Sequence, residues 1–403
     1  MSRQHGRRLM LEVSEAVDLI ERHVGNFGTE NIPLVAAAGR ILRQAVDAER
    51  ALPPYDRVMM DGIAVRHGEG RVFQVLGAQR AGMPAQRLDR DDACLEVTTG
   101  AVLPEGADAV IPVERLIRNG DTVTLEDGYV MEAGQFIHRR GIDCQQGARL
   151  LDPGLRLNAP ALAVLAGNGC ANVEVAKVPR IGIVSTGDEL VAVDAPVREW
   201  EIRASNDHAI AGALRARGFD DVSFDRIVDD LDATVATLGA LLDRCDVLVL
   251  SGGVSMGTFD YVPRAMEALG VTRIFHKIAQ RPGKPMWFGV GPRGQRVFAL
   301  PGNPVSALTC CVRYVVPALL SAQGLLAKER FTVRLDAEVA LIPTLARFVP
   351  VRVHHDQAGQ ALAHPLPMPT SGDFNHLATT HGFVELPKGE RAPPGTHAVF
   401  HGW

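Results

Sequence analysis

The sequence predicts a multidomain protein of the α/β and β classes, and three observations support this expectation. The chain has 403 residues, more than one hydrophobic core usually organises, so two to four domains are expected. Apolar strand-like runs alternate with helical segments from residue 179 onward, which is typical of a mostly parallel sheet with crossover helices. Short apolar runs broken by Gly, Pro and Asp fill residues 71–141 and 329–403 and indicate two β-rich modules.

The first half of the chain is expected to begin with one helix and to continue mainly in strands. Apolar residues over 10–25 recur with the spacing of a helix. Apolar runs separated by turn residues then follow at 72–76, 94–97, 109–113 and 122–125.

The segment from 179 to 328 is expected to form a sheet with helices between its strands. Apolar runs predict strands at 181–184, 224–228, 247–250 and 297–300. Helical spacing and end signals predict helices at 205–218, 231–242 and 305–320. Ligands of such sheets bind outside the carboxyl ends of the strands. The loops 185–189, 251–260 and 301–304 should therefore open onto one face.

Composition and charge exclude several classes of protein. Hydrophobic residues make up 46% of the chain and charged residues 22%, which indicates a globular protein. The net charge of −5 argues against nucleic-acid binding. The six cysteines form no Cys-x-x-Cys pair and are expected to be reduced core thiols. We see no signal peptide and no run near the ~20 apolar residues of a membrane span, so a cytoplasmic protein is expected.

A glycine-rich loop after the strand at 247–250 predicts a phosphate-bearing ligand. Gly252 and Gly253 allow a close approach of the backbone, whose N–H groups can then face a phosphate. Asp260 ends the loop, where a magnesium ion could bridge protein and phosphate.

Three cations occur within a short proline-stiffened segment. Lys277, Arg281 and Lys284 would suit an anionic ligand, and alternation along an extended segment would place the first two on one side. A solvated surface loop is the other interpretation. From this segment alone, the ligand site and the surface loop are about equally probable. The neighbouring glycine loop favours the ligand site.

Four acidic positions and one threonine have both a functional and a structural interpretation. Asp229 could bind a metal or a ribose, or it and its neighbour Asp230 could cap a helix. Glu189 could bind a metal or lie in the first turn of a helix. Asp61, Thr99 and Asp143 lie in turn-like segments that are more often structural than functional.

Seven short motifs occur in order along nearly the whole chain, and together they resemble the molybdopterin molybdenumtransferase family, known as MoeA in bacteria and as the E domain of gephyrin in animals. The motifs are Pro-Pro-Tyr-Asp…Met-Asp-Gly at 53–62, Thr-Gly…Pro-Glu-Gly-Ala-Asp-Ala-Val at 99–110, Arg-Arg-Gly-Ile-Asp at 139–143, Ser-Thr-Gly-Asp-Glu-Leu at 185–190, Ser-Gly-Gly-Val-Ser at 251–255, Pro-Gly-Lys-Pro at 282–285 and Leu-Pro-Gly-Asn-Pro-Val-Ser at 300–306. Each is weak alone, but seven with fitting order and spacing are specific.

The resemblance implies an elongated homodimer whose subunits have four parts. Residues 1–26 and 142–178 would form a discontinuous linking domain, and 27–141 a β-rich inserted domain. Residues 179–328 would form a three-layer α/β domain with a mostly parallel sheet, and 329–403 a small C-terminal β-barrel. The active site would lie between the α/β domain of one subunit and the inserted domain of the other.

The implied reaction converts adenylylated molybdopterin and molybdate into molybdenum cofactor and AMP, with a divalent metal such as Mg²⁺. An adenylyltransferase would act upstream, and molybdoenzymes or chaperones would receive the product. Carried over to matching positions, the catalytic residues are Asp61, Thr99 and Asp143 of one subunit with Asp229, Lys277 and Arg281 of the other. The implied metal ligands are Glu189 and Asp260. The implied cofactor-binding residues are Gly252, Gly253, Ser255, Lys284, Pro301, Gly302, Asn303 and Pro304.

The chain departs from the family pattern at several positions. Ile63 stands where the family usually has a tyrosine, and Arg281 stands where it usually has a lysine. An arginine offers a planar fork of donors instead of a point charge, so the anion geometry is expected to differ. The stretch 369–376, with Ser371, follows the usual Gly-Ser-Gly pattern only loosely.

Two other functions are compatible with parts of this sequence. The same α/β domain occurs in pterin-binding and scaffold proteins that bind a ligand without converting it. A related domain occurs in nucleotide-handling competence-damage proteins, but the motifs around Asp61 and Thr99 argue against that class because the domain occurs there without them.

Overall fold

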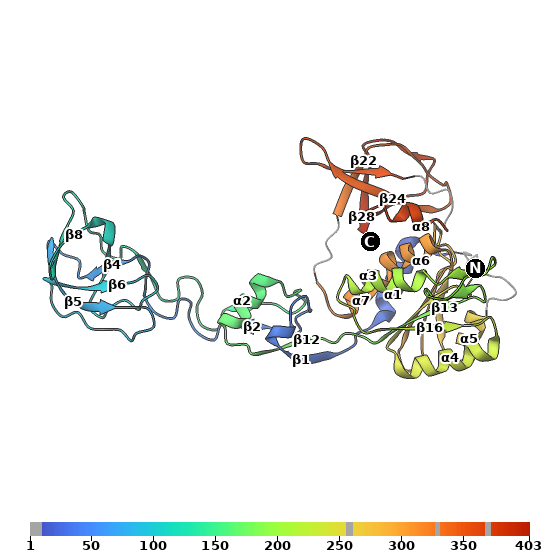
Figure 1. Ribbon diagram of the computed structural model, residues 1–403, viewed down its shortest axis with the longest axis horizontal. Helices are drawn as coiled ribbons and strands as arrows, with labels where there is room; N and C mark the ends of the chain where they lie inside the picture. The colour runs from blue at the N-terminus through green and yellow to red at the C-terminus, as the bar shows by residue number, and fades with distance from the viewer. Residues whose placement is uncertain (1–9, 255–260, 327–330, 367–371) are drawn as a thin grey trace, which may run out of the picture.

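The computed structural model describes residues 10–254, 261–326, 331–366 and 372–403, and it is elongated (Figure 1). A β-rich inserted domain lies at one end, a small linking domain in the middle, and an α/β domain at the other end. The C-terminal barrel packs against the α/β domain.

The α/β domain is built on a six-stranded sheet in the order β16-β13-β17-β21-β20-β18. Neighbours from β16 to β21 pair in parallel, and β20 and β18 are antiparallel additions. The strands are β13 (Ile181–Thr186), β16 (Val222–Ile227), β17 (Val247–Ser251), β18 (Thr272–His276), β20 (Trp287–Val290) and β21 (Arg296–Leu300), with short flanking strands β14 (Leu190–Val191), β15 (Ile202–Arg203) and β19 (Gln280–Arg281).

Helices cover both faces of this sheet, so the predicted three-layer, mostly parallel architecture is confirmed. Val247 and Val249 of β17 face one core, while Leu248 and Leu250 face the other. The first core is covered by α1 (Val13–Val24), α3 (Asn206–Arg215), α6 (Pro304–Cys310) and α7 (Val316–Ala322), and the second by α4 (Leu231–Arg244) and α5 (Val262–Ala268).

The helix predicted at 305–320 contains a π-helical turn, η3 (Cys311–Val315), between α6 and α7. Pro317 lies in the first turn of α7, where its missing N–H is tolerated best because the wide turn before it relaxes the contact with the preceding carbonyls. By length and hydropathy, Pro304–Ala322 could span a membrane, contrary to the expectation that no such run exists. Because 72% of it is buried inside the protein, we interpret it as a core helix.

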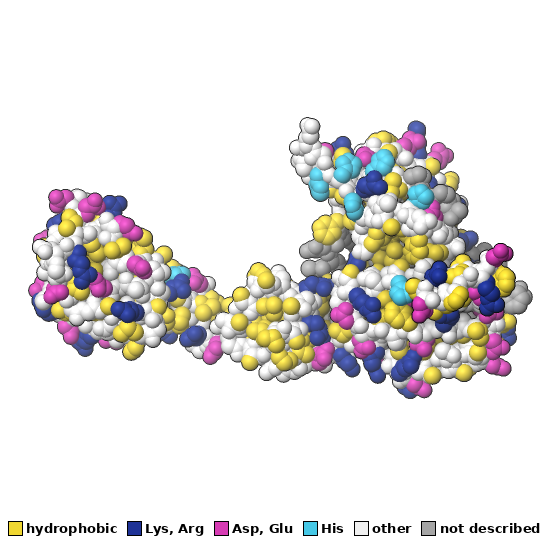
Figure 2. All heavy atoms as spheres, in the orientation of Figure 1, with side chains coloured by type: hydrophobic (Ala, Val, Ile, Leu, Met, Phe, Trp, Pro, Cys, Tyr) yellow, Lys and Arg dark blue, Asp and Glu magenta, His cyan; other side chains and the backbone are white. Residues whose placement is uncertain are grey.

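The linking domain joins two distant stretches of chain. β1 (Thr29–Pro33) pairs with β12 (Asn172–Ala176), and β2 (Val46–Asp47) pairs with β11 (Arg149–Leu151) beside α2 (Ala159–Gly167) and the short helix η1 (Leu34–Ala36). Figure 2 shows many hydrophobic side chains on its visible face. The exposed large hydrophobic residues of this domain include Val35, Leu155 and Val164.

Two domain boundaries differ from those expected. Residues 29–47 pair and pack with 149–176, so this stretch belongs to the linking domain and not to the inserted one. Helix α1 shares its core with the α/β domain, because Ala16 and Ile20 belong to the same hydrophobic core as Ile183 and Ile210. Strand pairing over more than a hundred residues determines the first boundary, and local sequence patterns do not reveal it.

The inserted domain is β-rich, as predicted. Its six-stranded sheet has the order β7-β4-β6-β5-β9-β8. Its elements are β3 (Arg57–Val58), β4 (Gly62–Val65), β5 (Val72–Gln79), β6 (Ala93–Val97), β7 (Ala109–Pro112), the short helix η2 (Val113–Arg115), β8 (Leu116–Asn119), β9 (Thr122–Leu125) and β10 (Ile137–His138).

The C-terminal module is the small barrel that was expected. The ring β24-β25-β22-β28-β26 closes because β26 pairs again with β24. Its elements are β22 (Phe331–Leu335), β23 (Val339–Ala340), β24 (Ala346–His355), β25 (Ala361–Pro365), α8 (Phe374–Leu377), β26 (Gly382–Leu386), β27 (Arg391–Ala392) and β28 (His397–Gly402).

A mostly buried ion pair holds the barrel on the α/β domain. Arg313 of η3 donates from Nε to Oε2 of Glu385 on β26 at 2.7 Å. His401 Nε2 lies 3.4 Å from the same oxygen. Phe348 and Phe383 of the barrel pack in the core of the α/β domain, so the two domains share one continuous core.

We expect this contact to weaken as the pH falls from about 4.5 towards 2. Burial raises the pKa of Glu385, but His401 and Arg313 outweigh burial and lower the pKa from 4.5 to about 2. Because folding lowers this pKa, the ionised Glu385 stabilises the folded state at pH values above the pKa of 4.5 in the unfolded chain, by on the order of 3 kcal/mol. Protonation of the carboxylate at lower pH removes that contribution. Thermal unfolding at about pH 6 and about pH 3 measures the loss. Glu385→Gln should lose less stability than the wild type, and equal losses would contradict the prediction.

Candidate active site

A cleft of about 640 Å³ opens at the carboxyl ends of the parallel strands. The loops after β13 and β21 and the described start of the loop after β17, residues 252–254, all line it, so the prediction that these loops open onto one face is confirmed for the described residues. Gly372, from the barrel, also reaches its wall. Among the predicted site residues, those lining the cleft are Glu189, Asp229, Gly252, Gly253, Pro301, Gly302, Asn303 and Pro304.

The two glycines after β17 are required by sterics as well as by backbone conformation. Gly252 has φ +97° and Gly253 has φ +65°. A Cβ on Gly252 would lie 2.8 Å from both the backbone oxygen and Oγ1 of Thr186, and one on Gly253 would lie 2.8 Å from Val262 Cγ2. The loop therefore packs directly on the end of β13, and its backbone is free on the cleft side to approach a ligand.

Polar side chains beneath the loops hold them together. Asn206 Nδ2 donates to Ser251 Oγ at 2.7 Å and to the Gly302 oxygen at 2.8 Å. Among the residues that the structure describes, Asn206 Oδ1 and Thr186 Oγ1 are buried and find no hydrogen-bond partner. Buried polar atoms are normally paired, so these two are positioned to bind a ligand group.

Two carboxylates line the same cleft. Asp230 caps α4 by accepting from Ala233 N at 2.8 Å, so the capping interpretation holds for that residue, while Asp229 lines the cleft. Glu189 precedes strand β14 and not a helix, so its alternative interpretation as a first-turn acid is wrong. The backbone holds Glu189 in place, because its carbonyl oxygen accepts from Ile202 N at 2.8 Å.

Oxygen ligands such as these suit Mg²⁺, which usually takes one or two carboxylates with water and phosphate oxygens. The predicted ligand Asp260 and the predicted loop residue Ser255 lie outside the described residues, as does Ser371. Within the described ranges, no group of three or more His, Cys, Asp or Glu side chains is arranged to hold a metal. The two cleft carboxylates match the small protein ligand set of a magnesium ion, and a substrate and water would have to supply the other ligands.

The predicted cations do not line the cleft, although their neighbour Pro285 does. The segment is not extended as expected. Lys277 has φ +78°, and Ile278 N donates to the Lys284 oxygen at 2.9 Å, so the chain folds back on itself. Simple alternation therefore does not apply to Lys277 and Arg281.

Arg281 lies beside a second arginine, from the barrel. Strand β19 pairs in parallel with β24, with Arg281 in register with Arg347. Burial, and then the charge of Arg281, lower the pKa of Arg347. Within the parts of the chain that the structure describes, no ion pair joins either guanidinium to a carboxylate. Two neighbouring guanidinium groups favour an anion between them.

Asp61 and Thr99 lie together in the inserted domain. Asp61 Oδ1 accepts from Thr99 N at 2.6 Å and from Thr99 Oγ1 at 2.8 Å. These bonds lower the pKa of Asp61 below its ordinary value, the backbone bond most, so the carboxyl group is ionised at neutral pH.

Asp143 is oriented by a histidine that sequence reasoning missed. His138 Nε2 lies 2.9 Å from Asp143 Oδ1, and Arg57 Nη2 lies 2.9 Å from His138 Nδ1. Because arginine only donates, Nδ1 accepts and the proton of neutral His138 is on Nε2, facing Asp143. Strand β3 bonds both to β10, which carries His138, and to the 100–101 segment, which follows Thr99, so one strand joins the Asp143 and Thr99 groups.

One chain does not bring the two groups of predicted residues together. The inserted domain and the α/β domain lie at opposite ends of the elongated molecule (Figure 1). Asp61, Thr99 and Asp143 are therefore far from the cleft within a single subunit.

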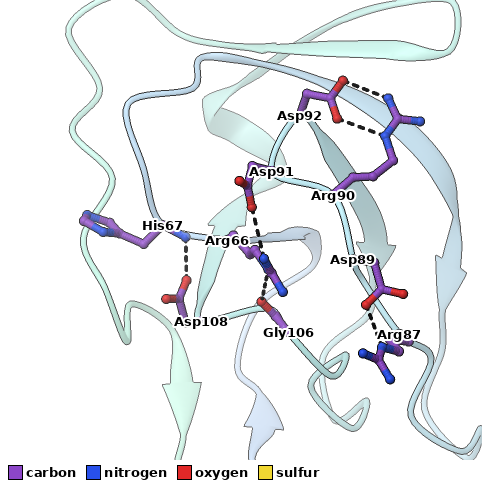
Figure 3. Close-up of polar contacts among 9 residues, drawn as sticks. All are labelled: Arg66, His67, Arg87, Asp89, Arg90, Asp91, Asp92, Gly106 and Asp108. Carbon is purple, nitrogen blue, oxygen red and sulfur yellow. Dashed lines mark hydrogen bonds and ion pairs between the residues drawn. The ribbon is translucent and has the colours of Figure 1, made fainter.

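A second hollow, of about 750 Å³, lies in the inserted domain. Several of its charged groups have partners within the domain (Figure 3). Arg66 bonds to Asp91 at 3.2 Å and to the Gly106 oxygen at 3.1 Å, and Asp108 accepts from His67 N at 2.5 Å. Because these groups already have partners, we place the candidate site in the cleft and not here.

Sequence reasoning missed Thr186, Asn206, Arg347 and His138. Thr186 lies within the motif at 185–190, so that motif could have indicated it. The other three are brought to their positions by contacts across the fold, and no local pattern distinguishes them.

Comparison with known proteins matches the whole described architecture. Family models described as "MoeA N-terminal region (domain I and II)", "Probable molybdopterin binding domain" and "MoeA C-terminal region (domain IV)" match residues 11–169, 182–321 and 332–401. A protein of Synechocystis sp. named molybdopterin molybdenumtransferase is 37% identical over 401 residues, covering 98% of this chain and 100% of the relative. A Bacillus subtilis protein of the same name is 31% identical, covering 96% and 92%.

Solved structures show the same similarity. Two structures of a molybdopterin biosynthesis moeA protein from Pyrococcus horikoshii have TM-scores of 0.82 and 0.81, with identities of 29% and 25%. Each covers 98% of this chain and 100% of the matched chain.

Proposed function

The chain belongs to the MoeA family, and on that premise we propose that it is a molybdopterin molybdenumtransferase: it inserts molybdenum from molybdate into adenylylated molybdopterin and releases AMP. Its role is in molybdenum cofactor biosynthesis, and its activity is that of a transferase.

The observation that carries this proposal is the cleft at the strand ends. Its glycine loops offer backbone N–H groups to a phosphate, and the unpaired Thr186 Oγ1 and Asn206 Oδ1 offer further bonds to the nucleotide or pterin. Such a cleft, at the carboxyl ends of a parallel sheet, suits a ligand that carries both a phosphate and a ring system.

Breaking the bond between the two phosphates requires positioning and neutralisation of charge more than covalent help. Glu189 and Asp260, the two metal ligands expected from the sequence, would hold Mg²⁺, and Asp229, which lines the same cleft as Glu189, would add a third carboxylate. The bound ion would neutralise the leaving AMP phosphate. Lys277, Arg281 and Lys284, with Arg347 beside Arg281, would concentrate molybdate next to the dithiolene sulfurs of the pterin.

A second copy of the chain completes the site in this proposal. The partner subunit's Asp61, Thr99 and Asp143 would face the cleft, and its ionised Asp61 would orient the attacking water or assist ligand exchange at molybdenum. The separation of the two groups within one chain supports this arrangement. The exposed apolar surface of the linking domain, with Val35 94% exposed, supports a contact between subunits.

The cellular setting follows from the reaction. An upstream adenylyltransferase supplies the adenylylated pterin, and molybdoenzymes or their chaperones receive the product. We place this enzyme in the cytoplasm.

The test is a turnover assay with the purified chain. We expect AMP and molybdenum cofactor to form only when adenylylated molybdopterin, molybdate and Mg²⁺ are all present. Tight binding of the pterin without AMP release would favour the alternative of a molybdopterin-binding scaffold. Removal of divalent metal with a chelator should stop AMP release, and readdition of Mg²⁺ should restore it.

A further inference from the structure

The segment that carries the predicted cations rests on a buried hydrogen bond. Tyr314, only 2% exposed, donates its hydroxyl proton to Oε1 of Gln280, which is fully buried. Gln280 directly precedes Arg281 in strand β19. The hydroxyl of Tyr314 therefore bonds to the residue next to a proposed anion-binding arginine.

The same glutamine continues the chain of bonds to the turn that follows. Gln280 Nε2 donates to Cys310 Sγ at 3.5 Å, and Cys310 Sγ donates to the Gly283 oxygen at 3.7 Å. Burial raises the pKa of Cys310 well above its ordinary value, so the group remains a thiol and keeps the proton it donates. A Cβ on Gly283 would clash with both Cys310 and Gln280, so the turn sits directly on these side chains.

Tyr314 reaches Gln280 from the π-helical turn η3. A π turn inserts one extra residue, which rotates the residues on either side of it relative to one another by about 100° compared with a regular helix. The π turn therefore affects which face of the helix carries Tyr314 and which carries Cys310. Both side chains point into the core of the α/β domain and meet the cationic segment there.

We propose that Tyr314 is a positioning residue: through Gln280 it fixes the segment from Lys277 to Lys284 so that its cations meet the oxyanion substrate. The proposal rests on the proposed function, because it assumes that this segment binds molybdate. Tyr314 itself is buried beneath the segment and touches no substrate.

Removing the hydroxyl should affect oxyanion binding more than turnover. Tyr314→Phe leaves the Gln280 oxygen without its donor inside the core, and the side chain must move to find another. We expect the KM for molybdate to rise about tenfold and kcat to change less than about threefold, since the Mg²⁺ ligands and glycine loops lie elsewhere.

A double variant separates positioning from stability. Tyr314→Phe with Gln280→Met replaces both partners by apolar groups of similar shape, which removes the unpaired oxygen. We expect this variant to regain most of the melting temperature lost by Tyr314→Phe while its KM for molybdate stays raised. Recovery of both values would show a structural role alone and would overturn the inference.

The inserted domain offers a matched control. Tyr129 donates to Gln135 Oε1 at 2.8 Å, the same pair of groups in a domain without the cationic segment. Tyr129→Phe should leave the KM for molybdate unchanged when both variants are assayed well below their melting temperatures.

Equilibrium dialysis with molybdate separates the role inferred for Tyr314 from the proposed function. If the wild type binds molybdate and Tyr314→Phe binds it equally well, the inference fails while the proposed function stands. If the wild type neither binds molybdate nor turns over, the proposed function fails and the inference fails with it. Weaker binding by Tyr314→Phe, with normal binding by Tyr129→Phe, supports both.

Discussion

Mixing two inactive variants, Glu189→Gln and Asp61→Asn, is expected to restore about one quarter of the wild-type activity. Glu189 lines the cleft of the α/β domain, and Asp61 lies in the inserted domain at the other end of the chain. If each site combines one cleft with the partner's inserted domain, half of the randomly formed dimers are mixed. Each mixed dimer then has one site with both changes and one with neither.

Each variant alone should lower kcat/KM by about 10² to 10³, because in the proposed site each removes one oriented charge next to the reacting phosphate or metal. The measurement is AMP release after co-expression of two differently tagged chains and purification through both tags. Purified mixed dimers should then reach about half the wild-type rate per subunit.

The matched control pairs two variants of the same cleft. Asp229 and Glu189 line one cleft, so Asp229→Asn with Glu189→Gln leaves no intact cleft in a mixed dimer. This pair should stay inactive at every ratio. Inactive mixtures of Glu189→Gln with Asp61→Asn would contradict a site shared between subunits.

The elements of the α/β domain were predictable because their signals are local. Buried parallel strands read as short apolar runs, and the strand over 247–250 appears as β17 with at most one residue of difference. The rule that ligands bind at the carboxyl ends of parallel strands then placed the three loops in one cleft. A local sequence pattern and a general rule of topology were therefore sufficient to predict the strands and the position of the cleft.

The cationic segment shows where such reasoning fails. Alternation assumes extended backbone at every residue, but Lys277 adopts a positive φ and the chain folds back to pair with Met286. The neighbour of Arg281 is Arg347, 66 positions away, because β19 joins the barrel strand β24. Contacts of this kind depend on how two domains pack, and a short motif does not encode them.

The predicted boundary of the inserted domain differs from the strand pairing for the same reason. Strand β1 could be recognised as a strand, but its partner β12 lies beyond the whole inserted domain. Motif order along the chain gives the sequence of parts, while only the pairing decides which stretches share a core. The sequence also could not predict that Thr186 Oγ1 and Asn206 Oδ1 find no partner among the described residues, because hydrogen-bond partners are set by the folded structure.

Gly252→Ala is expected to lower kcat/KM by about 10² and to weaken AMP binding to a similar extent. The new methyl group would lie 2.8 Å from the backbone oxygen of Thr186. That oxygen belongs to the end of β13 and cannot move aside as a flexible side chain would. The loop must therefore shift into the cleft, where its backbone is proposed to hold the phosphates. Isothermal titration with AMP and Mg²⁺ measures the effect.

Gly270→Ala separates this steric effect from the cost of the backbone conformation. Gly270 has φ +73°, also in the region that favours glycine, but a Cβ there meets nothing within 4 Å. Both variants carry the conformational cost of about 1 kcal/mol, and both should melt at a lower temperature than the wild type. Only Gly252→Ala should also lose AMP affinity. If the two variants bound AMP equally well, the close approach of the glycine loop to β13 would not be what shapes the phosphate site.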